Sequence, residues 1–209
     1  MGRGIDTTAN CQALAQEIKD AGYHFVCRYY NRNRPQKNLV KAEAQALSAV
    51  GLSIVAVWEN GFPTSAAYFN YETGKKDGAD AAAYARGTIG QPDGSPIYFT
   101  VDYDASAADL AGPVHAYFTG LLESLAAEKG GRTGYAAGVY GSGQTCEQIR
   151  AAFPAIQYAW LAESGGWSGS RQFSAWNLKQ LQTETVCGLS VDTNQSNGDG
   201  GGFRLHPEG

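Results

Sequence analysis

The sequence predicts a single α/β domain over residues 1–209, a small TIM-like (β/α)8 barrel that is somewhat irregular, with reduced helices near the C-terminus. Strand-like and helix-like segments alternate along the chain, which implies parallel strands joined by helical crossovers. About eight such units follow one another, and this favours a closed barrel over an open sheet. The 209 residues are enough for one well-buried core, and no linker or repeat divides them.

The individual elements are predicted from the hydrophobic pattern and from the residues that end each segment. Residues 54–58 are continuously apolar, as in a parallel strand covered on both faces. Gly22 and Gly51 follow helix-like segments, where glycine commonly ends a helix. The predicted strands cover residues 4–6, 23–30, 52–59, 96–104, 133–140, 156–163, 178–183 and 189–194. The predicted helices cover residues 11–21, 39–50, 77–89, 107–129 and 143–152.

The composition argues against several classes of partner. A net charge of −4 at pH 7 and a pI near 5.4 disfavour nucleic acids and anionic membranes. No apolar segment approaches the roughly 20 residues of a membrane span. The N-terminus lacks the basic and apolar regions of a classical signal peptide, so we expect none.

Four cysteines are spread along the chain without a C-x-x-C pair and without histidines at zinc-ligand spacing, so we expect no metal site. The sequence leaves two states open for them. All four are buried thiols, or one pair such as Cys146 and Cys187 forms a disulfide.

The strand predicted over residues 96–104 ends in two carboxylates, Asp102 and Asp104. The two-residue period of a strand would place both on the same side. Two like charges at short distance push their pKa values apart, so that one carboxylate stays ionised while the other holds a proton. This arrangement suits acid–base chemistry on an ether or acetal bond. Asp104 has an alternative role as the N-cap of the following helix, which would leave Asp102 unexplained.

Carboxylates also follow other predicted strands. The carboxyl ends of parallel barrel strands open on one face, where barrel enzymes keep their active sites. We therefore expect one pocket to contain Asp6, Glu59, Asp102, Asp104, Glu163 and Asp192. Two alternatives remain open. Glu163 precedes a Ser-Gly-Gly segment and is also explained as a solvated loop residue, and Asp6 and Asp192 could instead brace the first and last strands.

Aromatic residues accompany these acids along the chain. Carboxylates among aromatic rings suit a sugar polymer, because sugar rings present apolar faces to aromatic side chains and hydroxyls to acids. Core packing explains Trp58 and Trp160 equally well. The aromatic residues expected near the rim are Tyr29, Tyr30, Trp58, Tyr103, Tyr140, Trp160, Trp167 and Trp176.

Several motifs resemble those of glycan hydrolases. Gly4-Ile5-Asp6, Asp102-Tyr103-Asp104 and Val191-Asp192-Thr193-Asn194 resemble motifs of the family 25 glycoside hydrolases, lysozyme-type muramidases on an irregular α/β barrel. Gln180-Leu181-Gln182 is similar to a late strand of that family. Residues 96–104 and 138–142 resemble still more closely the glycoside-hydrolase-like domain family of bacteria. The resemblance spans the whole chain and implies the same barrel.

The resemblance also implies roles for the matching residues. In the muramidases an Asp-x-Glu motif provides an Asp that assists the acetamido group of the substrate and a Glu that acts as general acid. Here Asp102 matches the Asp, whereas Asp104 occupies the acid position with a shorter side chain. Either the substrate lies deeper, or Glu59 from the neighbouring strand supplies the proton. Asp6 and Asp192 match acidic residues that flank the muramidase site.

These observations predict an extracytoplasmic, monomeric glycoside hydrolase that acts on a bacterial cell-wall glycan, peptidoglycan first among them, without a cofactor. Export would follow a route without a classical signal peptide, or the sequence has been trimmed. The predicted catalytic residues are Asp104, Asp102, Glu59, Asp6 and Asp192. The predicted substrate-binding residues are Tyr29, Tyr103, Tyr140, Trp160, Glu163 and Gln182.

Three other functions stay open at this point. The missing Glu at position 104 favours a non-catalytic glycan-binding barrel. A carboxylate-rich site could hold Mg²⁺ or Ca²⁺ for phosphoester chemistry, although the chain lacks a glycine-rich phosphate loop and clustered Lys or Arg at strand ends. The missing signal peptide suggests a toxic or wall-trimming module of a larger secretion pathway.

Overall fold

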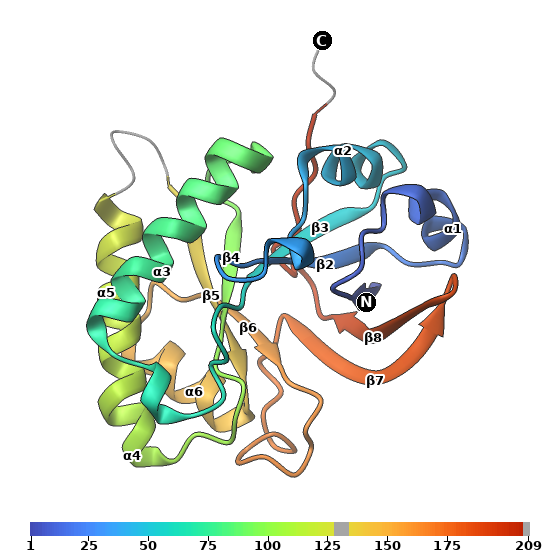
Figure 1. Ribbon diagram of the computed structural model, residues 1–209. Helices are drawn as coiled ribbons and strands as arrows, with labels where there is room; N and C mark the ends of the chain where they lie inside the picture. Colours follow the sequence, from blue (N-terminus) through green and yellow to red (C-terminus); the bar gives the residue numbers. More distant parts are fainter. Residues whose placement is uncertain (128–133, 207–209) are drawn as a thin grey trace.

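The computed structural model describes residues 1–127 and 134–206. Its eight strands close into a barrel in chain order, with helices outside it (Figure 1). The predicted α/β barrel is therefore confirmed. The strands are β1 Arg3–Asp6, β2 Phe25–Tyr30, β3 Ser53–Trp58, β4 Pro96–Thr100, β5 Ala136–Gly141, β6 Tyr158–Leu161, β7 Leu178–Val186 and β8 Leu189–Ser196.

The last strand runs in the opposite direction from the one expected. Strands β1 to β7 pair parallel in succession, but β8 pairs antiparallel with both β7 and β1. Only Cys187 and Gly188 separate β7 from β8, and both have a positive φ, 49° and 79°. Such a two-residue turn forms a hairpin, whereas a parallel crossover needs about a dozen residues. The prediction of eight parallel strands was wrong for this reason.

Strand β4 is shorter than expected. It ends at Thr100, so Asp102 and Asp104 lie in the following loop and the two-residue period does not relate them. The Asp102 N–H donates to the carbonyl of Pro63 at 2.9 Å, outside the β4–β5 ladder. Asp104 is not the helix cap either, because Ser106 caps that helix in a capping box with Asp109.

Six α-helices surround the barrel in the described part of the chain. In Figure 1, α3, α5 and α6 lie on one flank, and α1 and α2 lie on the other. Helix α3 begins earlier than predicted because Asn70 caps it by accepting from the Thr73 N–H at 2.8 Å. The predicted end of the helix over 107–129 and the start of the strand over 133–140 lie outside the described residues. The α-helices are α1 Ala15–Asp20, α2 Lys41–Ala49, α3 Tyr71–Tyr84, α4 Ala107–Asp109, α5 His115–Ala127 and α6 Gly143–Ala152.

Large side chains fill the inside of the barrel, which is therefore a packed core below the mouth. Tyr98 and Trp160 meet there edge to face, with ring centroids 5.7 Å apart. Gly138 makes room for them, because a Cβ at this position would lie 2.7 Å from the Tyr98 ring. Trp58 instead belongs to the outer core between strands and helices. The inner core consists of Phe25, Cys27, Val55, Val57, Tyr98, Trp160 and Leu178.

All four cysteines are free thiols. Cys146 is fully buried on α6, with its Sγ 3.7 Å from the carbonyl oxygen of Trp160. Burial raises the pKa of this thiol to about 12, so it stays protonated and inert at neutral pH. The Cys146–Cys187 disulfide that the sequence left open is not formed.

A buried ion pair fixes the segment that follows β1. Arg28 on β2 and Glu43 on α2 are both fully buried, with Nε and Oε1 2.8 Å apart. Arg28 also donates to the Thr7 carbonyl, and Glu43 accepts from the Cys11 N–H at 2.8 Å. The pair thus holds both ends of this segment, next to Asp6.

Replacing Glu43 by Ala is expected to lower the free energy of unfolding by about 3–5 kcal/mol, because it leaves Arg28 buried without its partner. Urea denaturation followed by circular dichroism measures the loss. Glu17→Ala on the exposed face of α1 is the control and is expected to cost less than about 1 kcal/mol. Equal losses in the two variants would contradict a stabilising role for the buried pair.

Candidate active site

A cavity of about 220 Å³ opens where the carboxyl ends of the parallel strands meet. Strands β2, β3, β4 and β5 contribute to it at or beside their last residues, and β6, β7 and β8 complete the wall. This is the end of the barrel at which the sequence places its acids. The lining residues are Tyr29, Val57, Glu59, Thr100, Asp102, Tyr140, Trp160, Gln180 and Asp192.

Two carboxylates in this cavity, Glu59 and Asp102, have raised pKa values. Burial raises the pKa of Glu59, the charge of Asp102 raises it further, and the nearby Lys37 opposes both effects. The Glu59 side chain nevertheless remains 28% exposed, so a ligand in the cavity could reach it. Burial also raises the pKa of Asp102. The charge of an ionised Asp102 thus favours the protonated form of Glu59.

Asp6 lies directly behind the cavity wall, with only 3% of its surface exposed. Its carboxylate accepts from the Tyr29 hydroxyl at 3.1 Å, from Gln180 Nε2 at 3.1 Å and from Asn194 Nδ2 at 2.7 Å. Tyr29 and Gln180 line the cavity, whereas Asp6 does not. Asp6 therefore orients the residues that could touch a ligand and is not itself exposed to one.

Asp192 pairs directly opposite Asp6 in the β1–β8 ladder, which puts both acids at the same mouth. Because β8 is antiparallel, Asp192 reaches this mouth from within the strand and not from its carboxyl end. Gln180 Nε2 connects it to Asp6, at 3.3 Å from Asp192 Oδ2. The Tyr140 hydroxyl donates to Gln180 Oε1 at 2.8 Å, so one amide organises both sides of the cavity.

Gln180, and not the predicted Gln182, lines the cavity. A β-bulge between Gln180 and Thr183 breaks the period of β7, and Gln182 is exposed with its amide on Glu184. Sequence analysis also missed Asn194, which bonds Asp6 and accepts from the Trp160 indole N–H at 2.9 Å. Both missed residues occur in the motifs that carried the family resemblance, and that was the available signal.

Three other predicted site residues lie outside the cavity. Asp104 is exposed. Its carboxylate accepts from the backbone N–H of Ser168 at 2.8 Å and from the Ser168 hydroxyl at 3.2 Å. Tyr103 packs against Phe69, with ring centroids 6.0 Å apart. Glu163 is exposed on the loop after β6. Of the acids predicted to act on substrate, only Glu59, Asp102 and Asp192 face the cavity.

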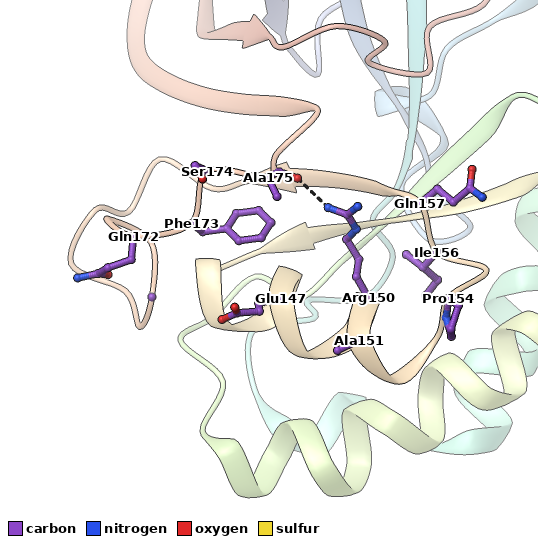
Figure 2. A pocket seen from close by; sticks show the side chains of 11 residues that line it. Glu147, Arg150, Ala151, Pro154, Ile156, Gln157, Gln172, Phe173, Ser174 and Ala175 are labelled. Carbon is purple, nitrogen blue, oxygen red and sulfur yellow. Dashed lines mark hydrogen bonds between the residues drawn. The ribbon is translucent and has the colours of Figure 1, made fainter.

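A larger cavity of about 490 Å³ lies beside α6, outside the barrel (Figure 2). Its far wall is the segment that leads to β7, and Arg150 on α6 donates to the Ala175 carbonyl at 2.7 Å across it (Figure 2). Glu147 is the only carboxylate among its lining residues. The smaller cavity, which combines several acids with aromatic walls, is therefore the candidate active site.

Within residues 1–127 and 134–206, no three His, Cys, Asp or Glu side chains come together as metal ligands. The same residues contain no helix with the length and apolar character required to span a membrane. The candidate site thus consists of carboxylates, side-chain amides and aromatic rings.

The stability of the fold should depend on the protonation of Asp6. Burial raises the pKa of Asp6 from 3.8 to about 6, although its three hydrogen bonds oppose this. Between these values the folded chain holds a proton that the unfolded chain releases. The resulting stabilisation is full below pH 3.8 and is lost as pH rises through about 6, a change of about 3 kcal/mol.

Urea unfolding of the wild type and of Asp6→Asn at about pH 4 and about pH 7 isolates this contribution. The free energy of unfolding of the wild type, relative to that of Asp6→Asn, should be lower at about pH 7 than at about pH 4. A difference that does not change with pH would contradict the raised pKa of Asp6.

Comparison with known proteins identifies the family. The family model described as "Rv2525c-like, glycoside hydrolase-like domain" matches residues 16–199. FadG of Bacillus subtilis (strain 168), an uncharacterized protein, is 31% identical over 179 residues, which cover 82% of this chain and 30% of FadG. The chain thus matches less than a third of the length of that curated relative.

Solved structures share the barrel. Rv2525c, a Tat-secreted protein of Mycobacterium tuberculosis, has a TM-score of 0.76 at 22% identity, over 96% of this chain and 98% of its own. A family 25 glycosyl hydrolase from Bacillus anthracis has a TM-score of 0.57 at 15% identity, over 95% and 90%. The predicted family relationship is confirmed, and the chain belongs to the Rv2525c-like, glycoside hydrolase-like domain family.

Proposed function

We propose that this domain is a glycoside hydrolase that cleaves a bacterial cell-wall glycan, with peptidoglycan as its substrate. The observation that carries the proposal is the pair Glu59 and Asp102, which line one cavity at the catalytic end of a muramidase-like barrel. Two carboxylates on one site are the usual equipment for glycosidic bond cleavage. No cofactor is needed for this chemistry.

Glu59 is the proposed general acid. Burial and the charge of Asp102 favour its protonated form, from which a proton passes to the glycosidic oxygen as the bond to the anomeric carbon breaks. Asp102 is the ionised partner, and it stabilises the positive charge that develops on the sugar ring. Water then bonds to the anomeric carbon and gives one proton to Glu59, which restores the acid. Asp104, the first choice from sequence, is displaced from this role because Ser168 holds its carboxylate outside the cavity.

The remaining lining residues would bind the sugar. Tyr29 and Tyr140 provide aromatic surface, and Gln180 and Asp192 provide polar groups for hydroxyls. Trp160, predicted to bind substrate, is only 1% exposed and instead packs edge to face against Tyr140, with ring centroids 5.2 Å apart. Asp6 acts as a positioning residue through Tyr29 and Gln180. Tyr103, Glu163 and Gln182 have no place in this proposal, because none of them lines the cavity.

A non-catalytic glycan-binding barrel is the second candidate. It is favoured by the position of Asp104, because the residue at the acid position of the muramidase motif is bonded to Ser168 and does not face the cavity. In that case the same carboxylates would recognise sugar hydroxyls without turnover.

The test is whether the purified chain lowers the turbidity of a peptidoglycan suspension and releases new reducing ends. Turnover that is insensitive to EDTA would support carboxylate catalysis and argue against a metal-dependent phosphoesterase. Binding without reducing ends would favour the second candidate, and neither binding nor turnover would refute both.

We also propose that the chain forms one domain and acts as a monomer outside the cytoplasm. The fold supports the first point, since the barrel uses strands from Arg3 to Ser196. The Tat-secreted relative Rv2525c supports the location. Sedimentation analysis of the purified chain tests the oligomeric state.

A further inference from the structure

Two cations and an exposed aromatic ring lie near Glu59, outside the residues that line the cavity. Lys37 Nζ lies 3.8 Å from Glu59 Oε1 and 5.8 Å from the centroid of the Tyr29 ring. Arg34 lies over the ring of Phe62, 4.5 Å from its centroid. In a chain with a net charge of −4, this concentration of positive charge beside an acidic cavity requires an explanation.

We propose that Arg34, Lys37 and Phe62 form a subsite for a carboxylate-bearing sugar unit of the glycan. The inference rests on the proposed glycoside hydrolase function and specifies its substrate class. The sugar ring would lie on Phe62, and its carboxylate would bind Arg34 and Lys37. N-acetylmuramic acid carries such a carboxylate on its lactyl ether where no stem peptide is attached, because an attached peptide converts this carboxyl into a neutral amide. The subsite would therefore select peptide-free strands over peptide-bearing strands and over neutral chitin-like polymers.

The cations are available for such a ligand. In the part of the chain that the structure describes, no carboxylate lies within ion-pair distance of Arg34. Lys37 is at the far limit of an ion pair with Glu59, so its ammonium group can contact a ligand as well. Arg34 is also close enough for its charge to lower the pKa of Glu59. The guanidinium therefore lies within electrostatic range of the proposed reacting group.

Phe62 is exposed in a way that packing does not explain. Its side chain is 64% accessible, and its φ of 74° lies in the left-handed region that non-glycine residues rarely adopt. The next residue, Pro63, accepts the Asp102 N–H at 2.9 Å, which places Phe62 beside the catalytic loop. Strained residues of this kind concentrate at ligand sites.

The two loops that carry the subsite are joined to each other. Asn60 Oδ1 accepts from the N–H groups of Arg32 and Asn33, both at 3.0 Å. Asn31 donates to the Glu59 carbonyl and accepts from the N–H of Arg34 at 2.6 Å. Asn31 and Asn60 are buried. The cations and the ring are therefore presented on preorganised backbone next to Glu59, as a binding subsite requires.

The test measures binding to two probes of one shape. One is an oligosaccharide of alternating N-acetylglucosamine and N-acetylmuramic acid with free carboxylates, and the other is the same oligosaccharide with its carboxylates amidated. Asp102→Asn serves as the background so that the probes are not consumed during titration calorimetry. We expect the free acid to bind about tenfold more tightly, and this preference to fall with added salt.

Arg34→Gln in this background is expected to abolish most of the preference. Arg204→Gln is the control, because it removes the same charge from an exposed residue near Gly51, at the other end of the barrel. This variant should keep the preference for the free acid. Phe62→Ala should weaken the binding of both probes by a similar factor, because it removes the aromatic surface on which the sugar ring would lie. Three results would overturn the subsite: the two probes bind with equal affinity, the preference survives Arg34→Gln, or neither probe binds.

Reducing-end assays of the wild type on the same probes separate this inference from the proposed function. A carboxylate preference in binding without any turnover would support the subsite and refute the hydrolase. Turnover of both probes at equal efficiency would refute the subsite and leave the hydrolase.

Discussion

Asp102→Asn is expected to lower glycan turnover by about a hundredfold or more while the barrel remains folded. The substitution is nearly isosteric, and Asp102 has no side-chain hydrogen bond that the fold depends on among those described. What it removes is a partly buried negative charge in the cavity. That charge is worth most in the transition state, where the sugar ring becomes positive.

Initial rates of reducing-end release on solubilised peptidoglycan measure this effect, with thermal unfolding as the check on folding. Asp93→Asn, on the exposed turn before β4, is the matched control and should retain full activity. An Asp102→Asn variant with normal turnover would move the chemistry to other residues of the cavity.

Glu59→Gln is expected to slow hydrolysis of the natural glycan by about 10²–10⁴-fold, the usual contribution of a general acid. The loss on an activated aryl glycoside should be less than about tenfold, because a good leaving group departs without being protonated. Comparing kcat/KM for the two substrates therefore identifies the proton donor independently of sugar binding.

Asp104→Asn is the companion variant, since the muramidase motif places the acid at this position. Its carboxylate accepts from Ser168 and lies outside the cavity, so we expect similar, small losses on both substrates. A selective loss on the natural glycan in Asp104→Asn, but not in Glu59→Gln, would assign the acid to Asp104. It would also require the loop that carries Ser168 to release the carboxylate when substrate binds.

Local sequence signals were sufficient for most of the barrel. The continuously apolar run of β3, the β-branched and aromatic run of β4 and the glycines that follow α1 and α2 depend only on residues close in sequence. The motifs around Asp6, Asp102 and Asp192 were enough for the family, which the family model confirms. Barrel geometry places Asp6 and Asp102 at one mouth, whereas Asp192 reaches the same mouth from within the antiparallel strand β8.

The membership of the site was decided by contacts between residues far apart in the chain. Asp102 and Asp104 are two residues apart, yet Pro63 binds the backbone of the first and Ser168 binds the side chain of the second. This separates a pair that a regular strand would have kept together. No local pattern reports the partner of a backbone N–H in a loop.

Strand pairing also explains the difference at Gln182 on β7, whereas the reversed direction of β8 follows from the short turn at Cys187 and Gly188. The order of these strands was predictable from their own residues, whereas the bulge that turns Gln182 outward appears only when β7 is paired with β8. The sequence by itself determined the barrel, its family and the acids available at its mouth. The tertiary structure alone decided that Asp104 and Glu163 lie outside the cavity and that Gln180 organises it, because long-range pairing sets where a side chain points.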